Sequence, residues 1–504
     1  KMTMKTNQIL LGLSLGLLGG FTAFDVTELN PKDSITDNSY WNTVSDLENY
    51  AKGFYMNLTG KGLRADGSEN LDDLNTLDER SDNRLVASPD QWLFNEWVIP
   101  SEANFDSKWY WNNIRNLNYF MTRYQRVNAT ESEVNPVVAV LRFFRAFDYF
   151  DKIKTFGDVP WYEKDLTTAD IDELYKARDD RDFVLGKIIE DLEFAIEWLP
   201  EKSAAEVGAL HKDAARTFLA RVCLHYGTYK KYHNVSTSPT SQELLQKAAT
   251  LAKEVMDSGL YDIVQGSDAG ANQSAFADYP LYYANQFTQE DLTTNKECIL
   301  ARVFEADVLT HNLARGGGVG LSKDFAESFL CKDGLPIANS SEYKGDETLD
   351  DEMANRDPRM YQIIDSKYRP YTVKSNGMRV VNSGIDDKKE FSPSEEPGTN
   401  IHSAPGLTGT ATGYSPIKLV SASQSQQDAV KTSSYDWFVF RYAEILLIYA
   451  EAKCELGECT QAVLDETINK LRDRVEMKHL TVSPVADLNP VDYGYSITPL
   501  LYEI

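Results

Sequence analysis

Apolar side chains recur at helical spacing along most of this chain and predict a mainly α-helical fold. Within residues 136–155, Phe143, Phe147 and Phe150 fall on one helical face, and the turn Gly157-Asp-Val-Pro160 indicates where that helix ends. The same periodicity predicts further helices on both sides of this one. They cover residues 40–58, 104–124, 182–199, 211–229, 242–258, 437–456 and 461–477.

Small side chains at the contact positions predict that these helices pack in pairs. The alanines concerned lie in three successive helices: Ala195, Ala214, Ala215, Ala220, Ala248, Ala249 and Ala252. Such pairs are typical of tetratricopeptide-type units, which stack into a superhelix, although an ordinary helical bundle would also fit. The expected fold is therefore mostly α, with tetratricopeptide-like helix pairs in an α-superhelical scaffold.

Residues 260–434 break this pattern. Gly, Ser, Pro, Asn and Asp become frequent, as in 316–320 and 395–400, and strand-like fragments such as 298–304 and 371–373 are short. Long irregular stretches inside a compact protein are usually functional or disordered. We therefore expect a large, irregular, loop-rich insertion that carries a functional surface. The predicted division is a leader over 1–21, a scaffold over 22–259, the insertion over 260–434 and scaffold helices again over 435–504.

The first 21 residues have the features of a Sec signal peptide. Lys5 supplies positive charge, residues 9–18 form an apolar run, and Gly19 and Gly20 follow. The run is too short to cross a bilayer as a helix, which needs about 20 apolar residues.

Composition and charge exclude several classes of function. The 504 residues carry 51 Lys and Arg against 77 Asp and Glu, a formal net charge of −26, whereas nucleic-acid binding needs clustered cations. The five cysteines form no CxxC pair and the six histidines no HExxH motif, so no transition-metal site is expected. The pairs Asp72-Asp73 and Asp350-Asp351 lack the alternating ligands of a calcium loop.

Residues 82–97 combine the side-chain types that sugars need, in an expected loop between helices. Pyranose rings pack on aromatic planes, and their hydroxyls need planar polar partners. Trp92 and Trp97 are the aromatic candidates, although packing in the core is at least as common a role for a single Trp. The polar candidates are Asp82, Asn83, Arg84 and Asn95.

The aromatic run 279–287 is a second candidate site, with Tyr282 and Tyr283 as its ligand-binding residues. Exposed aromatic rings on a loop are costly without a ligand or partner, although the run also fits an edge strand. By contrast, we expect at least two of Trp109, Tyr110 and Trp111 to serve packing.

Signatures of catalysis are scarce. Residues 316–323 are Gly-rich but lack the Gly-x4-Gly-Lys-Ser/Thr order, and there is no Gly-x-Ser-x-Gly elbow. Paired carboxylates for glycoside hydrolysis must lie about 5 to 9 Å apart, which a sequence does not define. A helical glycoside hydrolase and a purely structural tetratricopeptide scaffold are the alternatives to a binding protein.

Six segments, in order along nearly the whole chain, resemble the SusD/RagB-like family of surface nutrient-binding lipoproteins. The aromatic helix with its Gly157-Asp-Val-Pro160 turn resembles the hallmark segment of that family, and residues 355–359 match its Arg-Asp-Pro-Arg motif. The other similar segments are 183–200, 212–224, 249–261 and 440–452 together with 468–474. Any one of them could arise in an unrelated helical protein, but six in family order make coincidence improbable.

The resemblance implies a role in nutrient uptake. It implies that the protein sits on the outer face of the outer membrane, binds an oligosaccharide or polysaccharide without cleaving it and needs no cofactor. It also implies delivery of that ligand to a TonB-dependent transporter of the SusC type. A peptide-binding member is the alternative within the family. In glycan-binding members the loop after the first helices contributes to the site, which again indicates residues 82–97.

Two positions depart from the family pattern. The signal peptide of the family ends in a lipobox whose Cys is acylated, and residues 18–20 fit that box, but position 21 is Phe. Contact with a membrane is therefore expected only through a lipid anchor, and only if the native residue at position 21 is Cys. The family also continues with an Arg- and Glu-rich helix at the point where this sequence reaches Ile504, so a further core helix is expected there.

Overall fold

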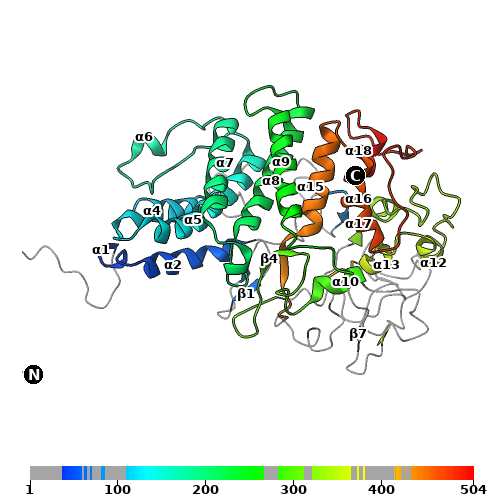
Figure 1. The fold of residues 1–504 in the computed structure, drawn as a ribbon, viewed down its shortest axis with the longest axis horizontal. Coiled ribbons are helices and arrows are strands. Elements are labelled where there is room, and N and C mark those ends of the chain that lie inside the picture. Colours follow the sequence, from blue (N-terminus) through cyan, green and yellow to red (C-terminus); the bar gives the residue numbers. More distant parts are fainter. Residues whose placement is uncertain are drawn as a thin grey trace, which may run out of the picture.

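Long helices arranged side by side form most of the molecule, as a computed structural model of the chain shows (Figure 1). The structure describes residues 37–58, 62–64, 69–70, 81–85, 109–265, 282–311, 320–364, 372–373, 379–380, 412, 414, 416–419, 421, 426 and 433–504. The scaffold helices are α1 (Asp37–Tyr40), α2 (Val44–Lys52), α4 (Asn112–Met121), α5 (Glu131–Phe156), α6 (Ile171–Leu174), α7 (Arg181–Trp198), α8 (Lys212–Tyr232), α9 (Ser241–Asp257), α15 (Tyr442–Glu455), α16 (Gln461–Glu466), α17 (Ile468–Asp473) and α18 (Pro499–Glu503).

The region that follows α9 contains only short elements among the residues described. Its helices are α10 (Tyr282–Asn285), α11 (Lys323–Glu327), α12 (Leu349–Met353) and α13 (Met360–Ile363). The strands of the chain are β1 (Gly62–Arg64), β2 (Glu69–Asn70), β3 (Arg84–Leu85), β4 (Cys298–Arg302), β5 (Leu309–Thr310), β6 (Gly320–Leu321), β7 (Thr372–Val373), β8 (Arg379–Val380) and β9 (Trp437–Arg441). All ladders are antiparallel: β1 pairs with β2 and β5, and β3–β6, β4–β9 and β7–β8 form two-stranded sheets.

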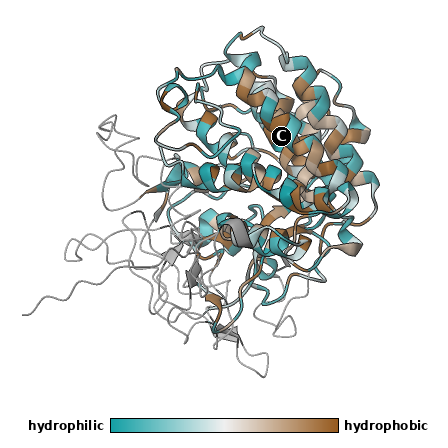
Figure 2. Cartoon of the chain, turned by 90° about the vertical axis from the view of Figure 1, so that its left-hand side faces the viewer, coloured by the Kyte–Doolittle hydropathy of each residue, from teal (hydrophilic) through white to brown (hydrophobic). Residues whose placement is uncertain are grey.

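The helices pack as successive antiparallel neighbours, which confirms the predicted fold class. α5 packs on α7, α7 on α8, α8 on α9 and α9 on α15. Each scaffold helix carries both apolar and polar positions (Figure 2), and the apolar side chains of these helices form one continuous core. The predicted contact alanines are fully buried, and Gly227 of α8 lies so close to α9 that a Cβ atom there would meet Leu245 at 2.8 Å. Small residues therefore set the spacing of the stack.

Helix α5 begins five residues earlier than predicted. Thr130 and Glu133 form a capping box in which the Glu133 carboxylate accepts the backbone N–H of Thr130 at 2.9 Å. Pro136 lies inside the helix, although proline favours the first turn and so marked the start of the predicted helix. The capping box satisfies the helix start and outweighs the hydrogen bond that Pro136 cannot donate.

The turn that ends α5 depends on Gly157. This residue has φ +71° and ψ −114°, a conformation that L side chains rarely adopt. We expect Gly157→Ala to lower the free energy of unfolding by about 1–3 kcal/mol, because the backbone there is strained for any other residue. Urea unfolding followed by circular dichroism measures the change. Gly186→Ala in α7 is the matched control: it has open space around it and should be neutral or slightly stabilising, and equal losses in both variants would contradict the assignment.

The predicted helix over residues 437–456 is wrong at its start. Residues Trp437–Arg441 form strand β9, which pairs with β4 inside the insertion, and α15 begins only at Tyr442. The run Trp-Phe-Val-Phe has high β propensity, and its partner lies more than 130 residues earlier in the chain, outside any local pattern. The predicted helix over 461–477 is likewise divided into α16 and α17 at Thr467, whose backbone is not helical. The predicted domain boundaries stay a prediction.

The two predicted helices near the start of the scaffold are shorter than expected. Within 40–58, α2 begins after a capping box at Thr43, and within 104–124, α4 begins only at Asn112. Trp109 and Trp111 therefore precede α4 and pack, partly buried, against the main core, while Tyr110 is exposed. The expectation that at least two of these three rings serve packing is confirmed.

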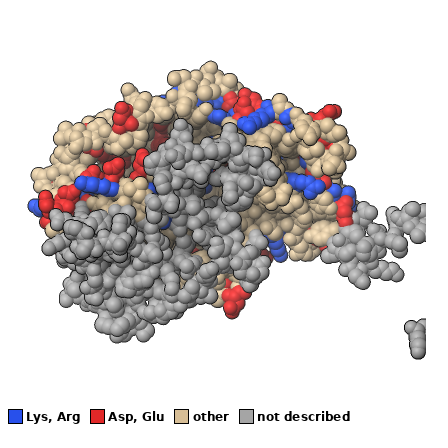
Figure 3. Space-filling view, turned by 180° about the vertical axis from the view of Figure 1, so that it is seen from behind, with Lys and Arg blue, Asp and Glu red and all other residues tan. Residues whose placement is uncertain are grey.

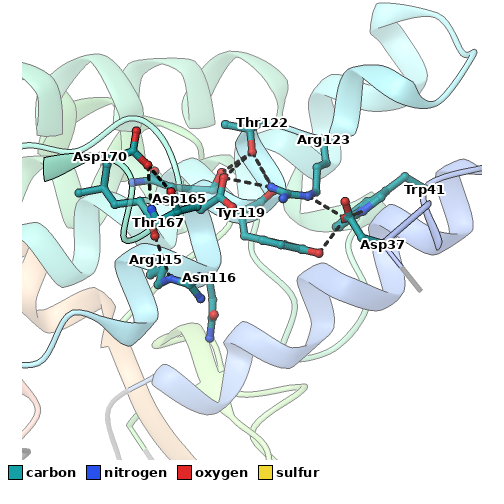
Figure 4. A network of polar contacts seen from close by, with 12 residues as sticks. Asp37, Trp41, Arg115, Asn116, Tyr119, Thr122, Arg123, Asp165, Thr167 and Asp170 are labelled. Atoms are coloured by element: carbon teal, nitrogen blue, oxygen red, sulfur yellow. Dashed lines mark hydrogen bonds and ion pairs between the residues drawn. The ribbon is translucent and has the colours of Figure 1, made fainter. Parts of the chain in front are cut away.

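A polar network fastens α1 to α4 (Figure 4). The Asp37 carboxylate accepts hydrogen bonds from Trp41 Nε1 at 2.9 Å, from the Tyr119 hydroxyl at 2.7 Å and from Arg123 Nε at 2.7 Å. Arg123 also binds Asp165 at 3.0 Å. Burial alone would raise the pKa of Asp37, but these hydrogen bonds hold it well below its ordinary value. Asp37 therefore stays ionised, and keeps its ion pair with Arg123, at pH values below the ordinary pKa of an aspartate.

Candidate ligand-binding site

The first predicted site segment is held against the insertion by strand pairing. β3 pairs with β6, so that Arg84 faces Leu321, and the backbone N–H of Ser322 donates to the carbonyl of Asn83 at 3.0 Å. The Ser322 hydroxyl donates to the carbonyl of Asp82. These bonds use only the backbone of residues 82–83 and leave both side chains exposed. Asp82 and Asn83 are therefore free to meet a ligand in the way the sequence predicts.

Arg84 does not share this exposure. Its side chain is 8% exposed and lies under the β3–β6 pair. In a strand successive side chains point to opposite faces, so the residue after the exposed Asn83 faces inward. The structure thus places Arg84 apart from the exposed Asp82 and Asn83, and its contact with a sugar stays a prediction.

Three of the predicted site residues, Trp92, Asn95 and Trp97, lie outside the described residues, and so does the side chain of Tyr282. Their roles stay predictions.

Tyr283 is buried, which makes the expectation of an exposed aromatic loop wrong at this residue. It lies in the short helix α10, so the alternative of an edge strand does not hold either. The backbone N–H groups of Tyr283 and Ala284 donate to the Gln362 side-chain oxygen at 3.2 and 3.0 Å. Its ring packs edge-on against Phe287 at 4.9 Å between centroids. Ring packing and the side-chain cap of α10 therefore account for Tyr283 and Phe287.

The electrostatic surroundings of Tyr283 differ from those of other tyrosines. Burial raises the pKa of buried phenols, to about 12 at Tyr55 for example. Burial acts in the same direction at Tyr283. The positive charges of Lys418, Arg441 and Arg359 outweigh it, so that the pKa of this hydroxyl lies below its ordinary value. The region around the hydroxyl thus favours negative charge.

A second, smaller core joins the two predicted segments. Leu321 of β6 belongs to this core, and so do Met360 and Tyr361 of α13. β6 carries the segment with Asp82 and Asn83, while α13 supplies Gln362, which binds α10. The segments are about 200 residues apart in sequence, and each binds an element that contributes to the same apolar cluster.

The Arg-Asp-Pro-Arg motif stabilises this small core. The Arg356 guanidinium is 2% exposed and donates to the carbonyls of Ala326 at 2.9 Å and Phe329 at 2.7 Å, at the end of α11, and to Glu352 of α12 at 3.3 Å. Asp357 accepts the backbone N–H and the side chain of Arg359. In the sequence, only the resemblance to a family draws attention to this motif. The structural role of Arg356 depends on backbone carbonyl groups that no spacing of residues predicts.

A buried carboxylate joins the insertion to the last helices and was missed by the sequence reasoning. Glu297, which directly precedes β4, is 0% exposed and binds Arg441 of β9 at 2.6 Å and Arg474 after α17. It also accepts the backbone N–H of Val264 at 3.0 Å. Acidic residues are abundant in this chain, so the neighbouring sequence does not distinguish the buried Glu297 from an acidic residue on the surface.

Metal binding and membrane insertion find no support among the described residues. Within that part of the chain no group of three or more His, Cys, Asp or Glu is arranged to hold a metal ion. Thr348 caps α12 by accepting the backbone N–H of Asp351, and its hydroxyl donates to the Asp351 carboxylate at 2.7 Å. Asp72-Asp73 lie outside the described ranges. No described helix is long and apolar enough to cross a bilayer. On the face seen in Figure 3, Lys and Arg lie in small groups among Asp and Glu.

Comparison with known proteins identifies relatives along most of the chain. The model of the SusD family matches residues 266–489, and that of a SusD-like family described as starch-binding and associating with the outer membrane matches 31–224. SusD-like protein P2 of Formosa agariphila is 23% identical over 476 residues, which cover 91% of this chain and 80% of the relative.

Solved structures of SusD-like proteins share the fold. A SusD-like carbohydrate-binding protein from Bacteroides fragilis NCTC 9343 matches with a TM-score of 0.64 at 20% identity, over 92% of this chain and 83% of its own. A laminarin-binding SusD-like protein matches with a TM-score of 0.53 at 16% identity, over 88% of this chain and 87% of its own. Because the two family models together extend over both the helical scaffold and the insertion, the chain belongs to the SusD family.

Proposed function

We propose that this protein captures an oligosaccharide or polysaccharide at the outer membrane and delivers it to a TonB-dependent transporter of the SusC type. The observation that carries the proposal is the match of two SusD-type family models to both halves of the chain, one of them described as starch-binding and associating with the outer membrane. The carbohydrate-binding and laminarin-binding relatives with the same fold support it.

Three buried carboxylates that pair with arginine have roles in the fold. Asp191, Glu297 and Asp357 each have arginine partners within hydrogen-bonding distance. We assign these groups to structure and the exposed Asp82 and Asn83 to ligand contact.

The proposed aromatic contacts can be tested by calorimetry. Titration of laminarin and starch oligosaccharides into the protein should give binding, and Trp92→Ala and Trp97→Ala should each raise Kd about tenfold, as expected for aromatic anchors. Trp198→Phe, in the partly buried end of α7, is the matched control and should leave Kd unchanged.

The products in the calorimeter cell distinguish the remaining functions. Intact ligand after binding supports capture, and shortened ligand would instead indicate a glycoside hydrolase. Binding of peptides in place of glycans would indicate that the protein is a peptide-binding member of the family. Unchanged affinity in both Trp variants, with the fold intact, would contradict the proposed site.

A further inference from the structure

Basic side chains surround the buried ring pair formed by Tyr283 and Phe287. The Lys418 ammonium lies 4.3 Å from the centroid of the Phe287 ring and 5.5 Å from that of Tyr283. The Arg441 guanidinium lies 5.3 Å from Phe287, and that of Arg474 lies 5.1 Å from Tyr283. Together with Arg359, whose charge also acts on the Tyr283 hydroxyl, these residues form what we call the Tyr283 cluster.

Among the described residues, carboxylates only partly balance this cluster. Arg441 and Arg474 share the single carboxylate of Glu297, and Arg359 has Asp357. In that part of the chain the four cations thus have two carboxylates as ion-pair partners.

Lys418 supplies the clearest part of the excess. Within the described part of the chain it forms no ion pair, and its contacts there are with the two rings and the Tyr283 hydroxyl. An excess of positive charge at a half-buried place is unfavourable unless an anion joins it, because the surrounding dielectric is low.

Part of the cluster remains accessible to solvent. The side chains of Arg359 and Arg441 are 30% and 21% exposed, and Lys418 is half-buried, whereas Tyr283 and Phe287 are almost fully covered. Lys418, Arg359 and Arg441 therefore form the outer layer of the cluster, and the two rings with the buried Arg474 form its inner layer. An anionic group can reach the cations without displacing the rings.

We propose that the Tyr283 cluster binds the carboxylate or sulfate group of an acidic oligosaccharide. The inference rests on the proposed function and narrows its ligand class from glycans in general to glycans that carry negative charge. Lys418 is the main contact, since its ammonium group has no carboxylate partner among the described residues and three donors to offer. The partly exposed guanidinium groups of Arg359 and Arg441 flank the bound group and add charge-assisted hydrogen bonds.

The experiment compares four probes on the full chain by calorimetry: a neutral laminari-oligosaccharide, an oligogalacturonate and a sulfated oligosaccharide of equal length, and inorganic sulfate. We expect at least one acidic oligosaccharide to bind about tenfold more tightly than the neutral one, the size of one charge-assisted hydrogen bond. This preference should shrink as NaCl rises, because salt screens the charge, while binding of the neutral probe stays constant.

Variants then assign the preference to the cluster. Lys418→Met removes the charge and keeps the length of the side chain, and it should abolish the preference without changing neutral binding. Lys418→Arg should restore it. Lys52→Met, on the exposed surface of the distant helix α2, is the matched loss of charge and should leave the preference intact (Figure 1). Thermal unfolding of each variant verifies that the fold is retained.

Each outcome has one meaning. Equal affinity for acidic and neutral probes overturns the inference and leaves the proposed function standing, whereas the absence of any glycan binding overturns both. Equal loss in the Lys418→Met and Lys52→Met variants would show that overall charge, and not the cluster, attracts the ligand, and this too overturns the inference. Tight binding of inorganic sulfate alone would overturn the assignment to a sugar.

Discussion

Glu297→Gln should lower the free energy of unfolding by about 3–5 kcal/mol, the usual effect of removing one partner from a buried ion pair. Glutamine has nearly the same shape, so the loss comes from charge and not from a cavity. The substitution removes the carboxylate that pairs with both Arg441 and Arg474. The Arg474 guanidinium, which is almost fully buried, then lies next to the Arg441 guanidinium without this negative charge. Urea unfolding followed by far-ultraviolet circular dichroism measures the change.

The control for this variant is an ion pair of the same kind in solvent. Glu458→Gln removes the partner of Lys453 at an exposed position, and it should change stability by less than about 1 kcal/mol, since water and salt screen exposed pairs. Similar losses in both variants would contradict the view that burial gives Glu297 its weight. In the Glu297→Gln variant we expect the contacts of β4 with β9 and with the segment after α17 to open first, because Glu297 joins them.

Arg356→Met should destabilise the small core of the insertion by about 3 kcal/mol or more, since each buried carbonyl that loses its donor costs about 1–3 kcal/mol. Methionine fills much of the space of the Arg356 side chain but donates no hydrogen bond to Ala326, Phe329 or Glu352. We expect the helical stack to keep its circular dichroism while limited proteolysis cuts the insertion more rapidly.

Ligand binding should weaken in the same variant. The segment with Asp82 and Asn83 is attached to β6, and Leu321 of β6 belongs to the core that Arg356 supports. Arg126→Met, which removes a half-exposed arginine from the pair with Asp37, is the control and should leave both proteolysis and affinity unchanged. A protease pattern identical to that of the unmodified protein would show that Arg356 is dispensable for this core.

Sequence patterns predicted most helices of the scaffold, because the residues that specify a helix and its ends lie close together in the sequence. The Phe-rich helix, its Gly157 turn and the contact alanines of α8 and α9 follow from periodicity and from the conformational properties of Gly and Pro. The errors occur where a distant partner decides. The predicted helix is wrong at β9 because the strand partner β4 lies more than 130 residues earlier in the chain, and α5 begins early because a capping box outweighs Pro136.

The candidate site was predictable only in part, for the same reason. The composition of residues 82–84 indicated polar contacts, and Asp82 and Asn83 are exposed, but the pairing that turns Arg84 inward involves a strand more than 230 residues later. The aromatic run drew attention to Tyr283, but the sequence does not predict the cations around it. They come from residues 359, 418, 441 and 474. No rule of spacing brings four such positions together.

The β4–β9 pair also brings distant parts of the chain together. Arg302 and Trp437 are directly paired in this ladder, although they are more than 130 residues apart in the sequence. The described residues between them contact the scaffold at further places, since β5 pairs with β1 and the Asn339 amide donates to the carbonyl of Ala486. A chimaera that exchanges these residues with those of a relative therefore has to preserve the β1–β5 and β3–β6 pairs as well as the β4–β9 ladder.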